Sequence, residues 1–102
     1  MRFGLPESAI EQIGAVFAAH REIERAVLYG SRAKGNFKPG SDIDLTLFGT
    51  DLTHELLLDL LVELDDLLLP WMIDLSLFAS LNHPALQEHI TRVGVLFYQR
   101  QE

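Results

Sequence analysis

The sequence has 102 residues, an apolar fraction of 48%, a charged fraction of 23% and a formal net charge of −7. A chain of this size and composition buries one hydrophobic core, so we expect a single domain over residues 1–102. The negative charge opposes autonomous binding to nucleic acid or to an anionic membrane, because both need many lysines and arginines. With no cysteine, the chain has no disulfide, thiolate nucleophile or cysteine zinc site.

Targeting signals are not indicated. No apolar run approaches the roughly 20 residues needed to cross a bilayer, and the opening MRFGLPESAIEQ lacks the basic-then-apolar layout of a signal peptide. We therefore expect a cytoplasmic protein. Six of the eight basic residues fall in the first 38 positions, which leaves room for a local site for a small anion such as a nucleotide.

Hydrophobic spacing and turn residues predict helices alternating with strands. Ile10, Ile13 and Phe17 have helical spacing, and Gly30 ends an apolar run typical of a strand. The expected elements are a helix at 6–21, a strand at 23–29, a short helical turn after Ser31, a loop at 36–41, a strand at 42–48, a leucine-rich helix from about 50 to 70, a strand at 71–78, a helix at 82–92 and a strand at 95–98. This order favours an α+β fold, in which a small mixed sheet of three to four strands is covered by helices.

Three aspartates lie where strand alternation would bring them together. Asp42, Asp44 and Thr46 share one face of the strand at 42–48, and the apolar residues between them share the other face. Asp74 repeats the pattern in the following strand. If the two strands pair, three acids converge on one patch. Converging carboxylates suit Mg²⁺, and two such ions can clamp the attacking and leaving oxygens of a displacement at phosphorus.

A glycine–serine step precedes these acids. Gly30 ends a strand and Ser31 begins a turn, so exposed backbone N–H groups and the serine hydroxyl can grip phosphate oxygens. Arg32 and Lys34 would add positive charge nearby. Taken singly, a Gly-Ser step is usually only a turn, and Asp-x-Asp is usually a solvated edge. The combination on neighbouring strands is more specific, and it is not a P-loop.

Three stretches together resemble the minimal nucleotidyltransferase (MNT) group of the DNA polymerase β superfamily. They are GSRAKG at 30–35, SDIDL at 41–45 and the later Asp74. The stretch NHPALQEHITRVGVLFY at 82–98 is similar to the final helix and strand of that family, so the resemblance covers nearly the whole chain. The family usually has arginine where Lys34 stands, a change that keeps the charge but loses the planar fork.

The resemblance implies the nucleotidyltransferase fold and Mg²⁺-dependent transfer of AMP from ATP to a hydroxyl, with pyrophosphate leaving. The residues carried over are Gly30 and Ser31 for the triphosphate, beside which Arg32 and Lys34 would add countercharge at the nucleotide site. Asp42 and Asp44 would hold two Mg²⁺ ions, and Asp74 would share the catalytic one. Asp74 would also help to orient or deprotonate the acceptor. In this family the partner is typically a HEPN ribonuclease toxin, and the MNT protein is its antitoxin, which modifies a toxin tyrosine with AMP.

The leucine-rich helix suggests a surface for such a partner. Leu58, Val62 and Leu69 form a second apolar stripe beside the one expected to face the sheet. This stripe either contacts another chain or is covered by the first and last helices. Three functions follow in order of preference: an adenylyltransferase antitoxin, a non-catalytic antitoxin that acts by binding, and a nucleotidyltransferase acting on RNA or a small molecule.

Overall fold

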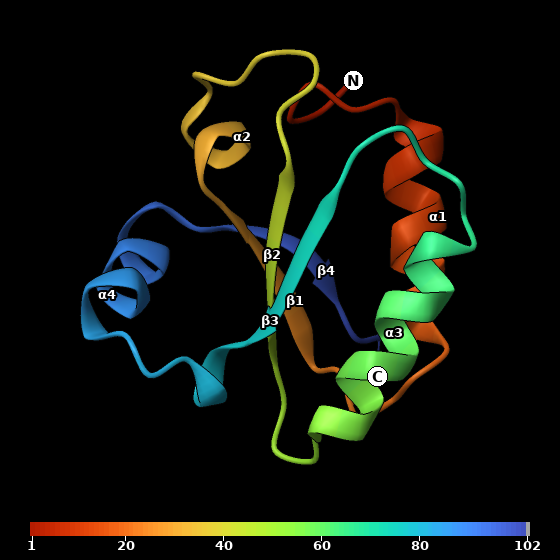
Figure 1. Cartoon of the computed structure of the whole chain (residues 1–102), viewed down its shortest axis with the longest axis vertical. Coiled ribbons are helices and arrows are strands. Elements are labelled where there is room, and N and C mark those ends of the chain that lie inside the picture. Colours follow the sequence, from red (N-terminus) through yellow and green to blue (C-terminus); the bar gives the residue numbers. More distant parts are fainter. Residues whose placement is uncertain (102) are drawn as a thin grey trace.

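The computed structural model describes residues 1–101, which form a four-stranded mixed sheet flanked by helices (Figure 1). The elements in chain order are α1 (Glu7–Ala18), β1 (Arg25–Tyr29), α2 (Ser31–Lys34), β2 (Ile43–Phe48), α3 (His54–Asp65), β3 (Ile73–Leu77), the 3-10 helix η1 (Phe78–Ser80), α4 (Pro84–Val93) and β4 (Val95–Gln99). The expected α+β fold and the expected order of helices and strands are therefore confirmed.

The sheet has the strand order β3-β2-β1-β4. β1 pairs antiparallel with both β2 and β4, whereas β2 and β3 run parallel and are joined by the crossover helix α3. The pairing of β2 with β3, on which the convergence of the acids depends, is thus present. It sets Asp44 directly beside Asp74 in the register.

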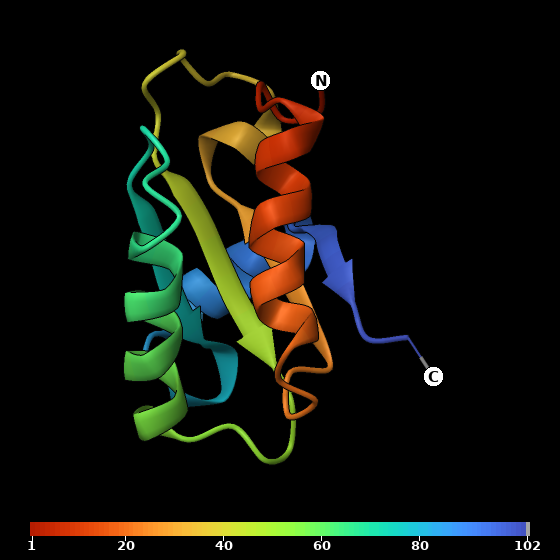
Figure 2. The same ribbon diagram turned by 90° about the vertical axis from the view of Figure 1, so that its right-hand side faces the viewer.

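The helices cover the two faces of the sheet unequally. Figure 2 shows α1 and α3 side by side in front of the sheet, with α4 behind it. The apolar residues of β1 and β2 that face α1 and α3 are fully buried and form the centre of the core: Ala26, Leu28, Ile43, Leu45 and Leu47. In residues 1–101 no helix is long and apolar enough to span a membrane.

Helix α3 is shorter than the expected helix at about 50–70: it begins at His54, just after the polar run that was expected to open it, and it ends at Asp65. The Thr53 hydroxyl accepts a hydrogen bond from the Leu56 N–H at 3.1 Å, which caps the first turn. The helix stops at Asp65, not near Pro70, and Leu68 takes a left-handed backbone conformation with φ 55°. Leu68 is therefore 87% exposed instead of lying on the stripe that faces the core. Residues 66 and 67 form the turn out of the helix, and Pro70 further disfavours helical backbone at Leu69.

Strand β2 also begins one residue later than expected. Ile43 is its first residue, and the Ile43 N–H donates to the Met72 carbonyl at 2.9 Å. Asp42 lies just outside the strand, at the end of the loop that follows α2. Two of the three aspartates are consequently placed by strand pairing, and the third is placed by a loop.

Candidate functional site

Asp44 and Asp74 lie next to each other on paired parallel strands. Neighbouring strands are about 4.8 Å apart, and side chains at paired positions point to the same face of the sheet. That face is opposite the one covered by α1 and α3. Asp44 is half-buried, whereas Asp42 and Asp74 are exposed. The structure therefore brings Asp44 and Asp74, which differ in depth, to one face of the sheet, and Asp42 lies at the end of the loop before β2.

The acids act on one another electrostatically. Burial raises the pKa of the Asp44 carboxyl above its usual range, and the negative charges of Asp74 and Asp42 raise it further. Each of these causes makes the ionised carboxylate unfavourable at this position. A cation beside Asp44 would remove much of that cost, so the site is suited to a positively charged ligand.

Gly30 lies against Asp44, between β1 and α2. Its backbone has φ 76° and ψ −155°, a conformation that residues with side chains rarely adopt. A Cβ atom at this position would also collide with the Asp44 carboxylate. Both the backbone and the neighbouring side chain thus require glycine, and the Gly-Ser step is built around the acidic site.

The other residues expected at a phosphate site are placed in two different ways. Ser31 is the first residue of α2 and is partly exposed, and Lys34 is exposed at the last residue of the same helix. Arg32 is only 2% exposed, and its guanidinium donates hydrogen bonds to backbone carbonyls inside the protein. The structure therefore leaves Ser31 and Lys34 accessible and does not bring the Arg32 guanidinium to the acids.

Sequence reasoning did not place Tyr29 and Ser76 in the site. Tyr29 pairs with Asp44 across β1 and β2, and it forms a hydrogen bond with Ser76. Burial raises the pKa of the Tyr29 hydroxyl, and the charges of Asp74 and Asp44 raise it too. Ser76 also donates to the buried Thr46 hydroxyl at 3.0 Å. Side chains alternate along β3, so Ser76 lies on the same face as Asp74. The position of Ser76 could therefore have been predicted from the sequence.

The carboxylates of Asp42, Asp44 and Asp74 are ligands of the kind that Mg²⁺ prefers. In residues 1–101, however, no three carboxylate or histidine side chains are gathered closely enough to surround one ion. Mg²⁺ usually takes one or two carboxylates together with substrate phosphates and water, and Asp44 and Asp74 would supply that number.

Comparison with solved structures identifies the fold. A chain of the crystal structure of a toxin–antitoxin with AMP-PNP aligns with a TM-score of 0.70 and 22% identity, over 95% of this chain and 76% of that one. A chain of the toxin–antitoxin MntA–HepT aligns with a TM-score of 0.68 and 18% identity, over 94% and 74%.

A third similar structure contains a chemically modified partner. It is described as a tri-AMPylated HEPN toxin from Shewanella oneidensis in complex with an MNT antitoxin, and it aligns with a TM-score of 0.68 and 18% identity, over 93% of this chain and 73% of that one. Among proteins with curated descriptions, none matches this chain. Residues 11–102 match the family described as Polymerase beta, Nucleotidyltransferase, and the chain therefore belongs to that nucleotidyltransferase family.

Proposed function

We propose that this protein is a Mg²⁺-dependent nucleotidyltransferase that transfers AMP from ATP to a hydroxyl, most simply a tyrosine, of a cognate HEPN ribonuclease toxin in the cytoplasm. The observation that carries the proposal is the side-by-side placement of Asp44 and Asp74 next to a glycine that leaves room for the Asp44 carboxylate. Family membership and the AMP-PNP and AMPylated-toxin structures support it.

The nucleotide-binding part of the proposal concerns the turn from β1 into α2. The first N–H groups of a helix have no acceptors within the helix, so those at the start of α2, with the Ser31 hydroxyl, are suited to phosphate oxygens. Gly30 keeps this approach free of a side chain. Lys34 would add positive charge from the end of α2, whereas the Arg32 guanidinium is buried and donates to backbone carbonyls.

The transfer step uses the acids. The acceptor oxygen forms a bond to the α-phosphorus of ATP, the bond from that phosphorus to the pyrophosphate oxygen breaks, and pyrophosphate leaves. Asp74, which is exposed, would orient the acceptor hydroxyl and accept its proton. Asp42 and Asp44 would hold two Mg²⁺ ions, with Asp74 sharing one of them. Mg²⁺, when bound, supplies charge that neutralises the phosphates and the carboxylates.

The proposed contact with the toxin lies on α3 and the segment after it. Leu58 and Val62 are 50% and 61% exposed, and Leu69 is partly exposed. An open cavity of about 680 Å³ lies beside them, and its lining includes Val62, Leu69 and Asp42. Because Asp42 lines the same cavity, a partner bound to these apolar residues could reach the acidic site. An exposed apolar surface of this kind is typical of a contact with another protein.

The test is transfer of label from α-labelled ATP to the HEPN-domain protein encoded beside this chain, in the presence of Mg²⁺. We expect label on a tyrosine of that protein with the wild type, and loss of label with Asp42→Asn and with Asp74→Asn. The exposed apolar surface also favours a second function, neutralisation by binding alone. Equal neutralisation by the wild type and both variants, with no label transferred, would select that second function.

A further inference from the structure

Arg32 is the centre of a set of contacts that holds the loop preceding Asp42. Its Nε and Nη2 donate to the Ser41 carbonyl at 3.0 and 2.8 Å, and Nη2 also donates to the Pro39 carbonyl at 3.1 Å. Its Nη1 donates to the Phe3 carbonyl at 2.8 Å. A planar fork with five N–H groups can reach three carbonyls in different directions at once.

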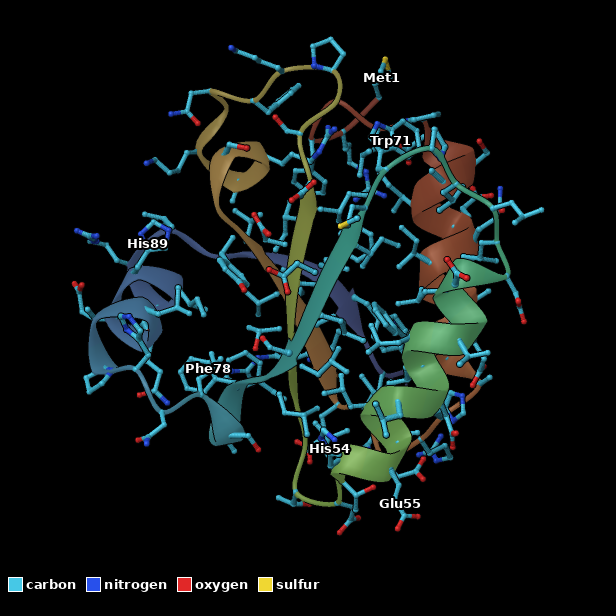
Figure 3. All side chains as sticks on the ribbon, in the orientation of Figure 1. Met1, His54, Glu55, Trp71, Phe78 and His89 are labelled. Carbon is cyan, nitrogen blue, oxygen red and sulfur yellow. The ribbon has the colours of Figure 1, made fainter. Side chains whose placement is uncertain are left out.

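Two further side chains hold the same loop. The Trp71 indole Nε1 donates to the Pro39 carbonyl at 3.0 Å, and the guanidinium of Arg32 lies 6.0 Å from the Trp71 ring centroid. Figure 3 labels Trp71 at the same end of the molecule as Met1, beside the start of β3. The Phe37 ring packs so closely on Gly4 that a Cβ there would overlap it. The loop is thereby joined to the N-terminal segment, to α2 and to the residues before Asp74.

The loop is also ordered internally. The Lys38 N–H donates to the Ser41 hydroxyl at 2.8 Å, and the Ser41 N–H donates to the Lys38 carbonyl at 3.0 Å. Asp42 is the next residue, and it precedes the first residue of β2. Strand pairing fixes Asp44 and Asp74, whereas the position of Asp42 depends on this loop. The loop in turn depends on Arg32.

Electrostatics agree with this arrangement. Burial lowers the pKa of the Arg32 guanidinium, and the negative charge of Asp42 acts in the opposite direction. The charge of Asp42 thus acts on the guanidinium through space, whereas the hydrogen bonds of the guanidinium go to backbone carbonyls. All three of its nitrogens donate to protein oxygens, and the side chain is only 2% exposed, so a phosphate has little access to the guanidinium.

We infer that Arg32 is a positioning residue, which sets the place of Asp42 through the loop at residues 36–41 and does not bind the triphosphate. The inference rests on the proposed function for its catalytic consequence. Its structural part, that Arg32 orders the loop, stands independently of any transfer activity.

Arg32→Lys is the main test, because lysine keeps the positive charge but lacks the planar guanidinium that donates to three carbonyls at once. We expect kcat for AMP transfer to fall about 10- to 100-fold, since small displacements of a reacting group have effects of this size. The KM for ATP should change by less than about threefold, because interactions with the bound nucleotide are kept. A raised KM for ATP with unchanged kcat would overturn the inference and make Arg32 a phosphate ligand.

Two readouts do not depend on transfer. Hydrogen exchange of the amides at residues 36–42 should become about tenfold faster or more in Arg32→Lys, because the loop opens more easily. Mn²⁺, followed by its electron paramagnetic resonance signal as a substitute for Mg²⁺, should bind more weakly. If neither changes, the inference is overturned even where transfer is slow. If the wild type transfers nothing, the proposed function fails, and these two measurements still decide the role of Arg32.

Matched variants separate positioning from folding. Arg92→Lys changes an exposed arginine of α4, which pairs with Glu88 at 3.7 Å, and should leave transfer, loop exchange and Mn²⁺ binding unchanged. Trp71→Phe keeps an aromatic ring and removes the hydrogen bond to Pro39, so it should loosen the same loop to a smaller extent. If Arg32→Lys does not fold, Arg32→Gln, which keeps an N–H donor and loses the guanidinium, takes its place in the exchange measurement. Normal loop exchange in Arg32→Gln would then contradict the inference.

Discussion

Gly30 shows at the scale of one residue how the backbone makes room for chemistry. Its φ of 76° is unfavourable for residues with a side chain, and a Cβ would collide with Asp44. We expect Gly30→Ala to lower the free energy of unfolding by about 1–3 kcal/mol. Urea denaturation followed by circular dichroism would measure the change. AMP transfer should fall as well, because Asp44 has to move.

Gly14 supplies the control for that substitution. It lies within α1, and a Cβ there would meet no heavy atom within 4 Å. Gly14→Ala should therefore raise the free energy of unfolding by about 0.5–1 kcal/mol, as expected for glycine in a helix. A Gly30→Ala protein as stable as the wild type would contradict the close packing of Gly30 on Asp44.

Asp44 carries a cost in stability that depends on pH. Its pKa is raised in the folded protein, so the folded state holds this proton more tightly than the unfolded chain, where the pKa is about 3.9. The cost is therefore absent below about pH 4 and develops as the pH rises through the native pKa. Asp44→Asn should raise the free energy of unfolding at neutral pH by about 1 kcal/mol or less, because the carboxyl is partly solvated.

Urea denaturation over a pH series, without divalent cations, would measure this effect. The gain from Asp44→Asn should vanish below about pH 4, where the Asp44 carboxyl of the wild type is protonated in both the folded and the unfolded state. Asp59→Asn, on the exposed side of α3, is the control and should show no such gain. A gain from Asp44→Asn that is the same at every pH would show that charge is not its cause.

At the scale of elements, the strands and helices were predictable because their signals are local. The alternation of acids with apolar residues in β2 and β3 correctly separates the buried face from the acidic face. The end of α3 was not predictable from its leucines. Helical spacing continues through residues 67–69, and only the proline at position 70 indicates the earlier turn.

The burial of Arg32 could not be predicted from local sequence. Next to Gly30 and Ser31, a basic residue is expected to face a phosphate. Its carbonyl partners, however, include Phe3, which lies 29 residues away in the chain. The sequence shows that a charge is present, but the contacts that take it inside depend on how the N-terminal segment folds against the loop.

Helix α3 gives a prediction for partner binding. Val62 is 61% exposed and lines the cavity beside Asp42, so its substitution should leave the fold intact. Val62→Asp should weaken binding to the proposed HEPN partner about tenfold or more, because a carboxylate would be buried in the contact without a group to pair with it. Isothermal titration calorimetry would measure the affinity.

Leu96 provides the control for that experiment. It is 51% exposed on β4, the edge strand at the other side of the sheet from β3. Leu96→Asp introduces the same charge and should leave the affinity unchanged. If Leu96→Asp weakens binding and Val62→Asp does not, the contact lies on β4 instead of on α3.

At the scale of the whole molecule, the fold separates two surfaces that the proposed function needs. One face of the sheet carries Asp44 and Asp74, beside the glycine–serine step that follows β1. Helix α3 belongs to the layer on the opposite face (Figure 2), and its outer residues are exposed. Asp42 lies where the two meet, since it belongs to the acidic group and also lines the cavity beside α3. The net charge of −7 favours a basic partner.

The most direct test of the central claim is the stoichiometry of neutralisation. A catalyst modifies many toxin molecules, whereas a binding protein must be present at least in equal amount. We predict that, with ATP and Mg²⁺, this protein abolishes the ribonuclease activity of its HEPN partner at a molar ratio far below one, and that Asp44→Asn acts only near equal amounts. If the wild type also requires equal amounts and ATP makes no difference, the claim that it acts by AMP transfer is contradicted.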